Sequence, residues 1–483
     1  MIGAGIGGLA AIAGLLDAGW DVTAFERAPS LEPVGAGLGL APNGLRALDA
    51  LGLGDTLRAD AVHQELGMRR PDGRWLIRSS SGRMLADRFG DPIILVPRAR
   101  LIDALAGLIP PGVLSLSAEV TSVSADGRVT VAGGGELTAD LVVAADGIRS
   151  PARAALFPGH PGLTYSGFTT WRFITPVLDG PAPDMSETWG PGTTFGIMPM
   201  AGGRVYCYAA ALAPPGTAAP GGDELATLRD LFGGWHPQVG SMLGRVSSDD
   251  VLRNDVSELA RPLPSYRAGR VVLAGDAAHP MTPNLGQGAC QALEDAVTLA
   301  RFAAGGSRDS VPAVLDRYSA SRLPRTSMIV KRSHQASAMY KLASPPAVAL
   351  RDAIVSLVGK VAPDAAMRGV DPIFDWRPPA PGLPGLCSPF PPLEQRKSRT
   401  QACALPAGGG ERGRGPRDGE QCARREEGDE ARPLRAGRRA AAPQGHPGRG
   451  DVRHERHDDD GQGSEDRQAG VPDQRRVQQR ADR

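Results

Sequence analysis

Lysine is scarce in this sequence. Only four lysines occur among 483 residues, all after residue 330, so a lysine-dependent catalytic step cannot be served from the first 330 residues. The five cysteines lack the C-x-x-C spacing of zinc sites and do not suggest a disulfide framework, so the sequence predicts no metal site. These residues are Lys331, Lys341, Lys360, Lys397, Cys207, Cys290, Cys387, Cys403 and Cys422.

Long apolar runs and an excess of charge are also missing. No run of 18 apolar residues and no charged-then-apolar leader is present, which predicts a cytoplasmic protein that does not span a membrane. A formal net charge of +1 gives no field that would attract nucleic acid or a membrane surface. With 41% hydrophobic residues the chain can bury a large core, and its length favours two or three domains. We expect a monomer or a homodimer.

The sequence opens on a glycine-rich loop of the G-x-G-x-x-G type. Glycines in such a loop permit a tight turn, close approach of the backbone to a pyrophosphate and packing of the next helix, expected over Leu9–Ala18. A strand is expected over Trp20–Phe25, and a carboxylate after it can accept hydrogen bonds from a ribose diol. Only Met1 and Ile2 precede the loop, so the first strand is expected to be unusually short. The cofactor-binding residues predicted here are Gly3, Gly5, Gly7, Gly8, Glu26 and Arg27.

A second glycine-rich turn lies about 270 residues later. It runs from Gly275 to Gly288, after an apolar strand expected over Val271–Ala274 and before a helix expected over Gly288–Ala303. Such a turn adds contacts for a second part of the same cofactor, so the two turns together predict a flavoprotein that binds FAD.

The predicted fold is α/β with two domains. A Rossmann-like FAD-binding domain is expected over 1–70, 92–160 and 263–377. The stretch Tyr165–Leu212 concentrates aromatic residues at strand-like spacing, which predicts a second, mostly antiparallel β-sheet domain for the substrate over 71–91 and 161–262.

The composition changes at about Pro378. After Phe390 there is no aromatic residue, isoleucine or methionine, so the segment cannot bury enough apolar surface to offset its chain entropy. We therefore expect a disordered tail over 378–483. A nucleic-acid-binding arm is disfavoured because acidic residues are interspersed with the arginines, and an alternative is GC-rich DNA translated in a shifted frame.

Four motifs, in this order along the chain, resemble those of the FAD-dependent single-component aromatic hydroxylases. This family, the group-A monooxygenases, includes para-hydroxybenzoate, salicylate and urate hydroxylases, and the resemblance extends over about Met1–Trp376. The motifs are the first loop with Glu26-Arg27, Val96-Pro97-Arg98-Ala99-Arg100-Leu101, Asp146-Gly147, and Gly275-Asp276 through Glu294-Asp295.

The resemblance implies roles for individual residues. It places Asp276 on the ribityl chain, Arg98 on the FAD linker and the backbone of Val120 at the adenine. Asp146 is implied to contact FAD and, transiently, the pyrophosphate of NAD(P)H, and Gly39 lies in a further loop assigned to the cofactor. The residues implied to approach the isoalloxazine, at the positive end of the following helix, are Leu285, Gly286, Gln287, Gly288 and Ala289.

The resemblance also implies a reaction. NAD(P)H reduces FAD, O2 forms a flavin C4a-hydroperoxide, and one oxygen atom enters a small aromatic or heteroaromatic substrate in a site that excludes water. Pro283 would close the wall beside the flavin, and Arg204 and Tyr206 are the candidate substrate-side residues. His279 is either a general base or a structural residue of the turn. Further candidates for the lining of the site are Trp171, Phe195, Met198 and Tyr208.

The substrate is left open. Arg204 resembles a substrate-side arginine of urate hydroxylases, but Asn284 stands where those enzymes carry an aspartate, which argues against urate. Arg172 is a second candidate partner for an anionic ring.

Three alternatives compete with a hydroxylase. A flavin halogenase needs a lysine beside the flavin and a Trp-x-Trp-x-Ile-Pro motif, and here Phe173 replaces the second tryptophan. The second alternative is a non-hydroxylating flavoprotein such as an epoxidase. The third is a damaged gene product without activity.

Overall fold

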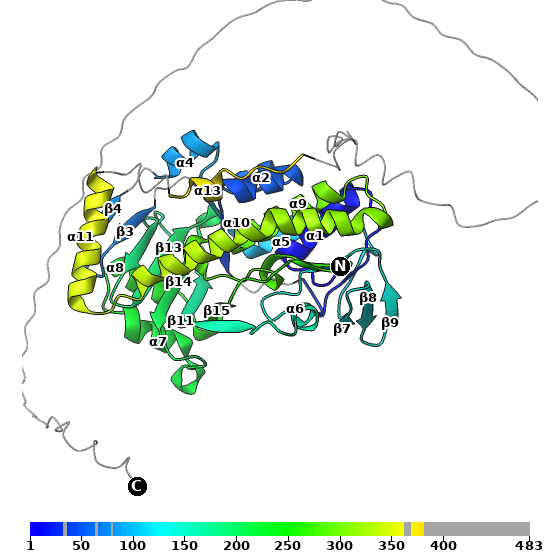
Figure 1. Cartoon of the computed structure of the whole chain (residues 1–483). Helices are drawn as coiled ribbons and strands as arrows, with labels where there is room; N and C mark the ends of the chain where they lie inside the picture. Colours follow the sequence, from blue (N-terminus) through cyan, green and yellow to red (C-terminus); the bar gives the residue numbers. More distant parts are fainter. Residues whose placement is uncertain (32–35, 63–65, 79–80, 362–368, 381–483) are drawn as a thin grey trace, which may run out of the picture. The chain divides into compact units, whose positions relative to one another are not determined.

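The computed structural model describes residues 1–31, 36–62, 66–78, 81–361 and 369–380 (Figure 1). The tail expected to be disordered, 378–483, lies outside the described residues from residue 381 onward. The two largest sheets of the described chain differ in type, one being largely parallel and the other largely antiparallel.

The amino terminus completes the parallel sheet. Ile2 forms parallel bridges to Phe25 and to Ala144, and so joins the strand pair β1–β6 to the strands β10, β17 and β16. The order is β6, β1, Ile2, β10, β17 and β16, and only β16 runs antiparallel. The first strand is thus as short as expected, and the second is paired only at the end of its expected range. The bounds are β1 Ala24–Phe25, β6 Leu114–Ser115, β10 Val142–Ala144, β16 Arg267–Ala268 and β17 Val271–Leu273.

Small residues let two helices approach each other beside this sheet. In α1, a Cβ at Gly14 would lie 2.8 Å from the Cβ of Ala300 in α9, so glycine is required for the observed distance between the helices. Helix α9 has the bounds that the sequence predicted. The helices on this sheet and its loops are α1 Ile6–Asp17, α2 Pro42–Ala50, α3 Gly54–Arg58, α5 Arg98–Ala106, α6 Pro151–Leu156 and α9 Gly288–Ala303.

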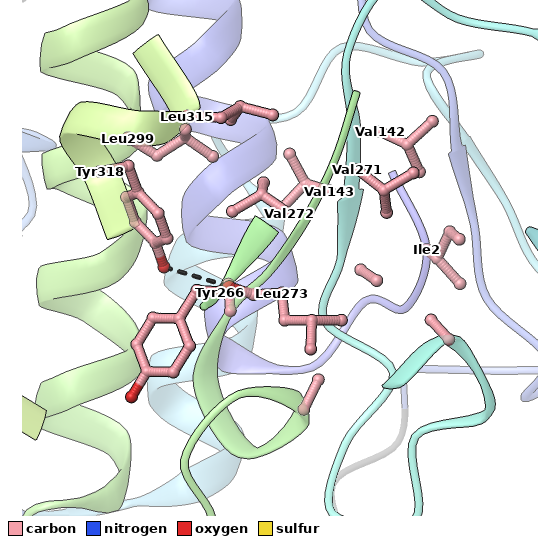
Figure 2. Close-up of a cluster of buried hydrophobic side chains, with 14 of the residues drawn as sticks. Ile2, Val142, Val143, Tyr266, Val271, Val272, Leu273, Leu299, Leu315 and Tyr318 are labelled. Carbon is pink, nitrogen blue, oxygen red and sulfur yellow. Dashed lines mark hydrogen bonds between the residues drawn. The ribbon is translucent and has the colours of Figure 1, made fainter. Parts of the chain in front are cut away.

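The strands β10 and β17 are buried on both faces, as expected for a parallel sheet covered by helices. Figure 2 shows their valines and Leu273 packed together with Leu299 of α9 and Leu315 of α10. The hydroxyl of Tyr318, also from α10, donates to the carbonyl of Leu273 at 3.3 Å. Because apolar side chains fill both faces, only the ends of these strands are available for chemistry.

The second sheet has seven strands in the order β15, β11, β14, β13, β12, β3 and β4. Every pairing is antiparallel except that of β12 with β3, which confirms the predicted mostly antiparallel sheet. The bounds are β3 Gly67–Arg69, β4 Trp75–Arg78, β11 Leu163–Ile174, β12 Ser186–Trp189, β13 Thr193–Pro199, β14 Val205–Leu212 and β15 Leu252–Leu259.

The two faces of the seven-stranded sheet have different neighbours. One face packs its apolar side chains, including Trp171 and Phe195, against α7 Glu224–Phe232 and α8 Pro237–Leu243. The opposite face carries Tyr206, whose ring lies against Gly37 so closely that a Cβ there would be 2.5 Å from it. Gly37 belongs to β2 Gly37–Leu40, which pairs with β5 Ile94–Pro97.

The long helix α10 Val311–Tyr340 runs from α9 toward α11 Pro345–Val361, which packs on β4 (Figure 1). Among the described residues no single helix is long and apolar enough to cross a membrane, and only the chain from Arg308 through α10, taken with α11 across a 120° bend, reaches that length and composition. The remaining elements are β7 Val120–Val123, β8 Arg128–Val131, β9 Gly135–Thr138, α4 Ser81–Phe89, α13 Asp371–Phe374 and the 3-10 turns η1 Ala201–Gly203, η2 Pro220–Gly222, η3 Ser248–Asp250, η4 Gly275–Ala277, η5 Pro283–Leu285 and η6 Arg308–Ser310.

Candidate active site

Three of the four predicted motifs meet at one edge of the parallel sheet. Gly3 follows Ile2, Glu26 follows β1, Asp146 follows β10 and Asp276 follows β17. Since these strands are parallel neighbours, all four residues lie at the carboxyl ends of strands, where open α/β sheets bind their ligands. The structure therefore brings together residues that are up to 273 positions apart in the sequence.

Protein packing explains three of the four glycines in the first loop. A Cβ at Gly3 would lie 2.5 Å from the carbonyl oxygen of Ala145, and one at Gly8 would lie 2.1 Å from that of Gly3. A Cβ at Gly7 would lie 3.2 Å from the Cβ of Ala292 in α9. Gly5 is different, because its φ of −70° suits any residue and no protein atom lies within 4 Å of an added Cβ. The space beside Gly5 is thus left for a ligand that approaches the backbone.

Two helices present unsatisfied N-termini at this edge. α1 begins after Gly5 and α9 after Gln287, and neither N-cap side chain makes a capping hydrogen bond. Neither first turn contains an acidic residue. Gly288, the first residue of α9, also has no protein atom within 4 Å of an added Cβ. Free N–H groups and the positive end of the helix dipole make both termini suitable for anionic or carbonyl oxygens of a ligand.

Glu26 is held beside the first loop. Its carboxylate accepts hydrogen bonds from the backbone N–H of Ala4 at 2.7 Å and of Ala28 at 2.9 Å, one on each oxygen. Each oxygen retains a further lone pair that can accept from a ribose hydroxyl. The neighbouring Arg27 is exposed to solvent.

A charged group gathers around Asp276. Asp276 keeps access to solvent. The protein around it removes part of the water from its carboxyl and raises the pKa of that group, while the positive charges of His279, Arg98 and Arg153 act to lower it. Burial likewise lowers the pKa of the Arg98 guanidinium, while Asp276 opposes that change. Arg98 is thus partly buried and lies within electrostatic reach of Asp276.

Arg153 links two of the loops at this edge. Its guanidinium donates to the carbonyl of Ile148 at 2.6 Å, in the loop after β10, and to the carbonyl of Ala277 at 2.9 Å, in the turn after β17. Asp146 accepts from the backbone N–H of Ala152 on one oxygen, and its other oxygen finds no partner among the described residues. Arg153 was not among the predicted site residues, although it lies only six residues after Gly147.

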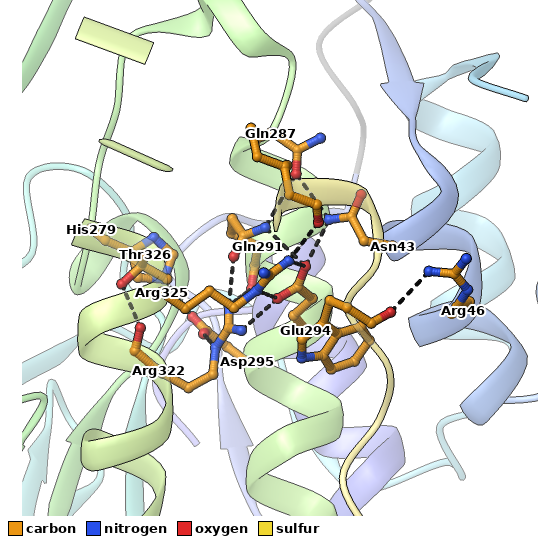
Figure 3. A network of polar contacts seen from close by, with 12 residues as sticks. Asn43, Arg46, His279, Gln287, Gln291, Glu294, Asp295, Arg322, Arg325 and Thr326 are labelled. Atoms are coloured by element: carbon orange, nitrogen blue, oxygen red, sulfur yellow. Dashed lines mark hydrogen bonds and ion pairs between the residues drawn. The ribbon is translucent and has the colours of Figure 1, made fainter. Parts of the chain in front are cut away.

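A buried network of charges joins α9 to α10 (Figure 3). Arg322 of α10 donates to Asp295 at 2.6 Å and pairs with Glu294, and Arg325 also pairs with Glu294 at 2.6 Å. Asp295 accepts in turn from the backbone N–H of Gly275 at 2.8 Å and contacts His279 Nε2 at 2.6 Å. Burial would raise the pKa of Asp295, but His279 and Arg322 outweigh it and lower the pKa to about 2. The network thus fixes the Gly275 turn against α9.

The same network reaches the start of α9. Asn43 of α2 donates to Glu294 at 2.7 Å and to the side-chain carbonyl of Gln287 at 2.9 Å. The amide nitrogen of Gln287 is buried and has no partner among the described residues, so a donor is left available at the N-terminus of α9. His279 is buried within this network, which supports the structural role among the two considered for it.

The remaining predicted cofactor residues occupy separate places. Ala118, two residues before Val120, donates its N–H to the carbonyl of Glu26, which puts the start of β7 next to the ribose candidate. Gly39 lies in β2, where an added Cβ would be in ordinary contact with Leu95. Pro283 and Gly286 are exposed, while Leu285 and Ala289 are partly buried.

The substrate-side candidates divide between the faces of the seven-stranded sheet. Tyr206, Tyr208 and Met198 lie on the face that meets β2 and β5. Trp171 and Phe195, also expected to line the site, lie on the opposite face under α7 and α8, because alternate strand residues point to opposite sides. Arg204 is exposed at the turn before β14.

Arg172 lies on the same face as Tyr208, its cross-strand neighbour. Its guanidinium donates to Asn254 at 2.5 Å, while its Nε is buried without a partner among the described residues. Its charge acts on both Arg98 and Tyr206. Arg172 therefore connects the sheet face to the charged group around Asp276. No group of three or more His, Cys, Asp or Glu side chains in the described ranges could hold a metal ion.

Comparison with known proteins identifies the family. Residues 111–333 match a family described as FAD binding domain. Over 372 residues the chain is 37% identical to an aurachin C monooxygenase/isomerase of Stigmatella aurantiaca, covering 76% of this chain and 95% of that protein. The chain belongs to the group A FAD-dependent aromatic monooxygenases. The resemblance noted in the sequence is thereby confirmed.

Further relatives of this monooxygenase support the assignment. It is 36% identical over 366 residues to a 3-amino-4-hydroxybenzoate 2-monooxygenase of Streptomyces cremeus, covering 73% of this chain and 90% of that one. A Klebsiella pneumoniae protein, HpxO, solved with FAD and uric acid, superposes with a TM-score of 0.69 at 26% identity, covering 77% of this chain and 95% of that chain. These findings confirm the predicted α/β fold and an FAD-dependent oxidoreductase.

The residues at the sheet edge fit FAD. The open space at Gly5 and Gly288, the two helix N-termini and the unpartnered donor of Gln287 all call for a ligand with oxygen acceptors at two separated points. A pyrophosphate and a flavin carbonyl, at opposite ends of one dinucleotide, have this chemistry.

Proposed function

We propose that this monooxygenase uses NAD(P)H and O2 to hydroxylate a small aromatic or heteroaromatic substrate. The observation that carries the proposal is the meeting of the Gly3 loop, Glu26, Asp146 and Asp276 at one sheet edge, directly beside the N-terminus of α9. The relatives named for aromatic substrates support the same conclusion.

The proposal assigns the parts of FAD to separate elements. The loop with Gly3, Gly5, Gly7 and Gly8 would hold the pyrophosphate, Glu26 with Arg27 the ribose, and the backbone at Val120 the adenine. Arg98, Asp146 and Asp276 would hold the linker and the ribityl chain, with Gly39 beside them. Residues 285–289 at the start of α9 would contact the isoalloxazine through their backbone.

FAD, when bound, supplies the redox chemistry by taking two electrons from NAD(P)H and passing them to O2. The chain supplies the surroundings. The dipole of α9 favours negative charge at its N-terminus. The apolar neighbours of Tyr206 on the sheet face, among them Met198 and Ile174, would keep water from the reaction.

On the substrate side we assign Pro283 to the wall beside the flavin and Tyr206 to the opposite wall. Burial raises the pKa of Tyr206 to about 12, so its hydroxyl stays protonated and can donate to a substrate oxygen. Arg204, exposed at the turn before β14, would act at the entrance, and Arg172 is better placed to pair with an anionic ring inside. We propose 71–91 and 161–262 as the substrate domain and 1–70, 92–160 and 263–377 as the FAD-binding domain.

The proposal is tested on the purified full chain. We expect a yellow protein whose oxidation of NAD(P)H is stimulated by at least one member of a panel of aromatic and heteroaromatic acids. With labelled O2, the product should gain one labelled oxygen atom. A protein that does not take up added FAD would refute the cofactor assignment. If FAD is bound but no aromatic compound stimulates the oxidation of NAD(P)H, the proposed hydroxylase activity is refuted.

A further inference from the structure

A row of polar residues crosses the face of the seven-stranded sheet that carries Tyr206. Glu187 of β12 pairs with Gly196 of β13, Gly196 pairs with Tyr208 of β14, and Tyr208 pairs with Arg172 of β11. Directly paired residues of neighbouring strands point to the same face. An acid and a base therefore lie on one face of the sheet, three strands apart, with a glycine and a tyrosine between them.

The glycine in this row permits an unusual placement of the tyrosine ring. A Cβ at Gly196 would lie 2.2 Å from Cε1 and 2.3 Å from Cζ of Tyr208. The ring of Tyr208 therefore lies flat across β13 and is directed at β12, where Glu187 is the residue paired with Gly196. Glycine within a strand marks such a close approach, since it has no side chain of its own to pack.

A second tyrosine meets the same carboxyl group from another element. Tyr340, at the end of α10, also interacts electrostatically with Glu187. Its ring packs edge to face against Trp189, with ring centroids 5.1 Å apart. The carboxyl of Glu187 thus has two phenol groups as neighbours, one from the sheet and one from a helix that the sequence places more than 130 residues away.

The three side chains of this cluster are neither fully buried nor fully exposed. Glu187, Tyr208 and Tyr340 are each partly accessible to solvent. Burial is the main cause that raises the pKa of each group. A ligand needs such partial access to reach a polar group that protein largely surrounds.

The cluster faces the same side as the proposed active site. Tyr206 neighbours Tyr208 with ring centroids 5.9 Å apart and packs on Gly37 of β2. Arg172, at the other end of the row, acts electrostatically on Arg98, which is next to Asp276. The row therefore extends the proposed site from the charged group around Asp276 toward the end of α10.

We propose that Glu187, flanked by Tyr208 and Tyr340, determines specificity by accepting a hydrogen bond from an amino or hydroxyl substituent of the aromatic substrate. Arg172 pairs with an acidic substituent on the opposite side of the ring. The inference rests on the proposed function of this site and names its substrate class, a ring with a hydrogen-bond donor across from an acid group. Glu187 and Arg172 are three strand spacings apart, which is about 14 Å between their backbones. An aromatic ring with a substituent at each end, and one hydrogen bond to each side chain, spans this distance.

The test uses the full chain with FAD bound and two probes of similar shape, 4-aminobenzoate and 4-methylbenzoate. Binding is followed by the change in flavin absorbance. We expect the wild type to bind the amino compound about tenfold or more tightly, the ratio that one hydrogen bond to a charged group supplies. Glu187→Met removes the acceptor and should bring the ratio close to one. Glu187→Gln keeps an acceptor and the shape of the side chain, so it should retain part of the preference.

Controls separate this effect from damage to the sheet. Glu258 is another carboxylate of the seven-stranded sheet, paired with His334 at 2.6 Å and outside the row, so Glu258→Met should leave the ratio unchanged. Arg172→Met should weaken both acids by the same factor.

Two results would overturn the inference. One is a wild type that binds the two probes equally well or binds neither, and the other is a Glu187→Met variant with normal FAD content that keeps the wild-type ratio. Failure of the proposed function is distinct, since it appears in the wild type as absent FAD or as NAD(P)H oxidation that no aromatic compound stimulates.

Discussion

Substitution of Gly5 by alanine should separate cofactor binding from folding. No protein atom lies within 4 Å of an added Cβ at Gly5, and its φ of −70° is available to alanine. Loss of chain entropy in the unfolded state favours alanine by about 0.4–1 kcal/mol, whereas alanine is a poorer N-cap than glycine by a similar amount. These effects offset each other, so the FAD-free protein should keep its free energy of unfolding within about 1 kcal/mol.

FAD binding should respond differently to the same change. The methyl group would occupy the space in which a phosphate approaches the N-terminus of α1, and loss of one hydrogen bond to a charged group costs about 1.5–3 kcal/mol. The dissociation constant of FAD should then rise about 10- to 150-fold. Quenching of flavin fluorescence during titration of FAD-free protein measures the constant, and thermal unfolding of the same preparation measures stability.

Gly8 provides the matched control, because both glycines lie in one loop. A Cβ at Gly8 would lie 2.1 Å from the carbonyl oxygen of Gly3, so Gly8→Ala should destabilise the protein with or without FAD. If Gly5→Ala bound FAD as tightly as the wild type, the space beside Gly5 would not be the pyrophosphate site. A Gly5→Ala protein as unstable as Gly8→Ala would show that the loop, and not the ligand, requires this glycine.

Three further outcomes follow from the charged residues at and behind the proposed site. Asp276→Ala should weaken FAD binding by about 1–3 kcal/mol, measured as flavin retained on gel filtration, and full retention would contradict the ribityl assignment. Arg322→Met leaves Glu294 and Asp295 with fewer cations in the interior. It should lower the free energy of unfolding, measured in urea, by about 3–5 kcal/mol. A loss well below that range would mean that Arg325 alone compensates the buried carboxylates. The pKa of Asp295 is about 2 in the folded protein and about 3.9 when unfolded, so its contribution is complete above about pH 5 and is lost progressively as the pH falls through about 2. The difference in melting temperature between wild type and Asp295→Asn should therefore shrink steadily as the pH falls from about 5 toward 2, and a constant difference would contradict the stabilising role of the charge.

Local patterns in the sequence predicted the elements that position the cofactor. Helix α9 has its predicted bounds because Gly288 ends a loop of small residues and an unbroken helical run follows. The strands β10 and β17 were readable as short apolar runs, since both their faces are buried. The strand expected over Trp20–Phe25 was wrong in length, because pairing begins only at Ala24.

Long-range arrangement could not be read in the same way. Alternation along β11 and β13 shows that two faces exist, but not that Trp171 and Phe195 face α7 and α8 while Tyr206 faces the proposed site. Arg322 was missed as a partner of Glu294, 28 residues earlier, since an arginine within a helix ordinarily indicates a solvated face. The ring of Tyr208 above Gly196 depends on cross-strand register, which the turn lengths did not reveal.

The distribution of lysine has a practical consequence for surface attachment. All three described lysines lie on α10, at its C-cap, or on α11, whereas the cations near the proposed site, Arg98, Arg153 and Arg172, are arginines. Amine-reactive resins and fluorophores couple to lysine and leave guanidinium groups intact. Immobilisation through these helices or through Lys397 would thus leave the cations of the proposed site unmodified, whereas an arginine-selective dicarbonyl reagent should inactivate the enzyme.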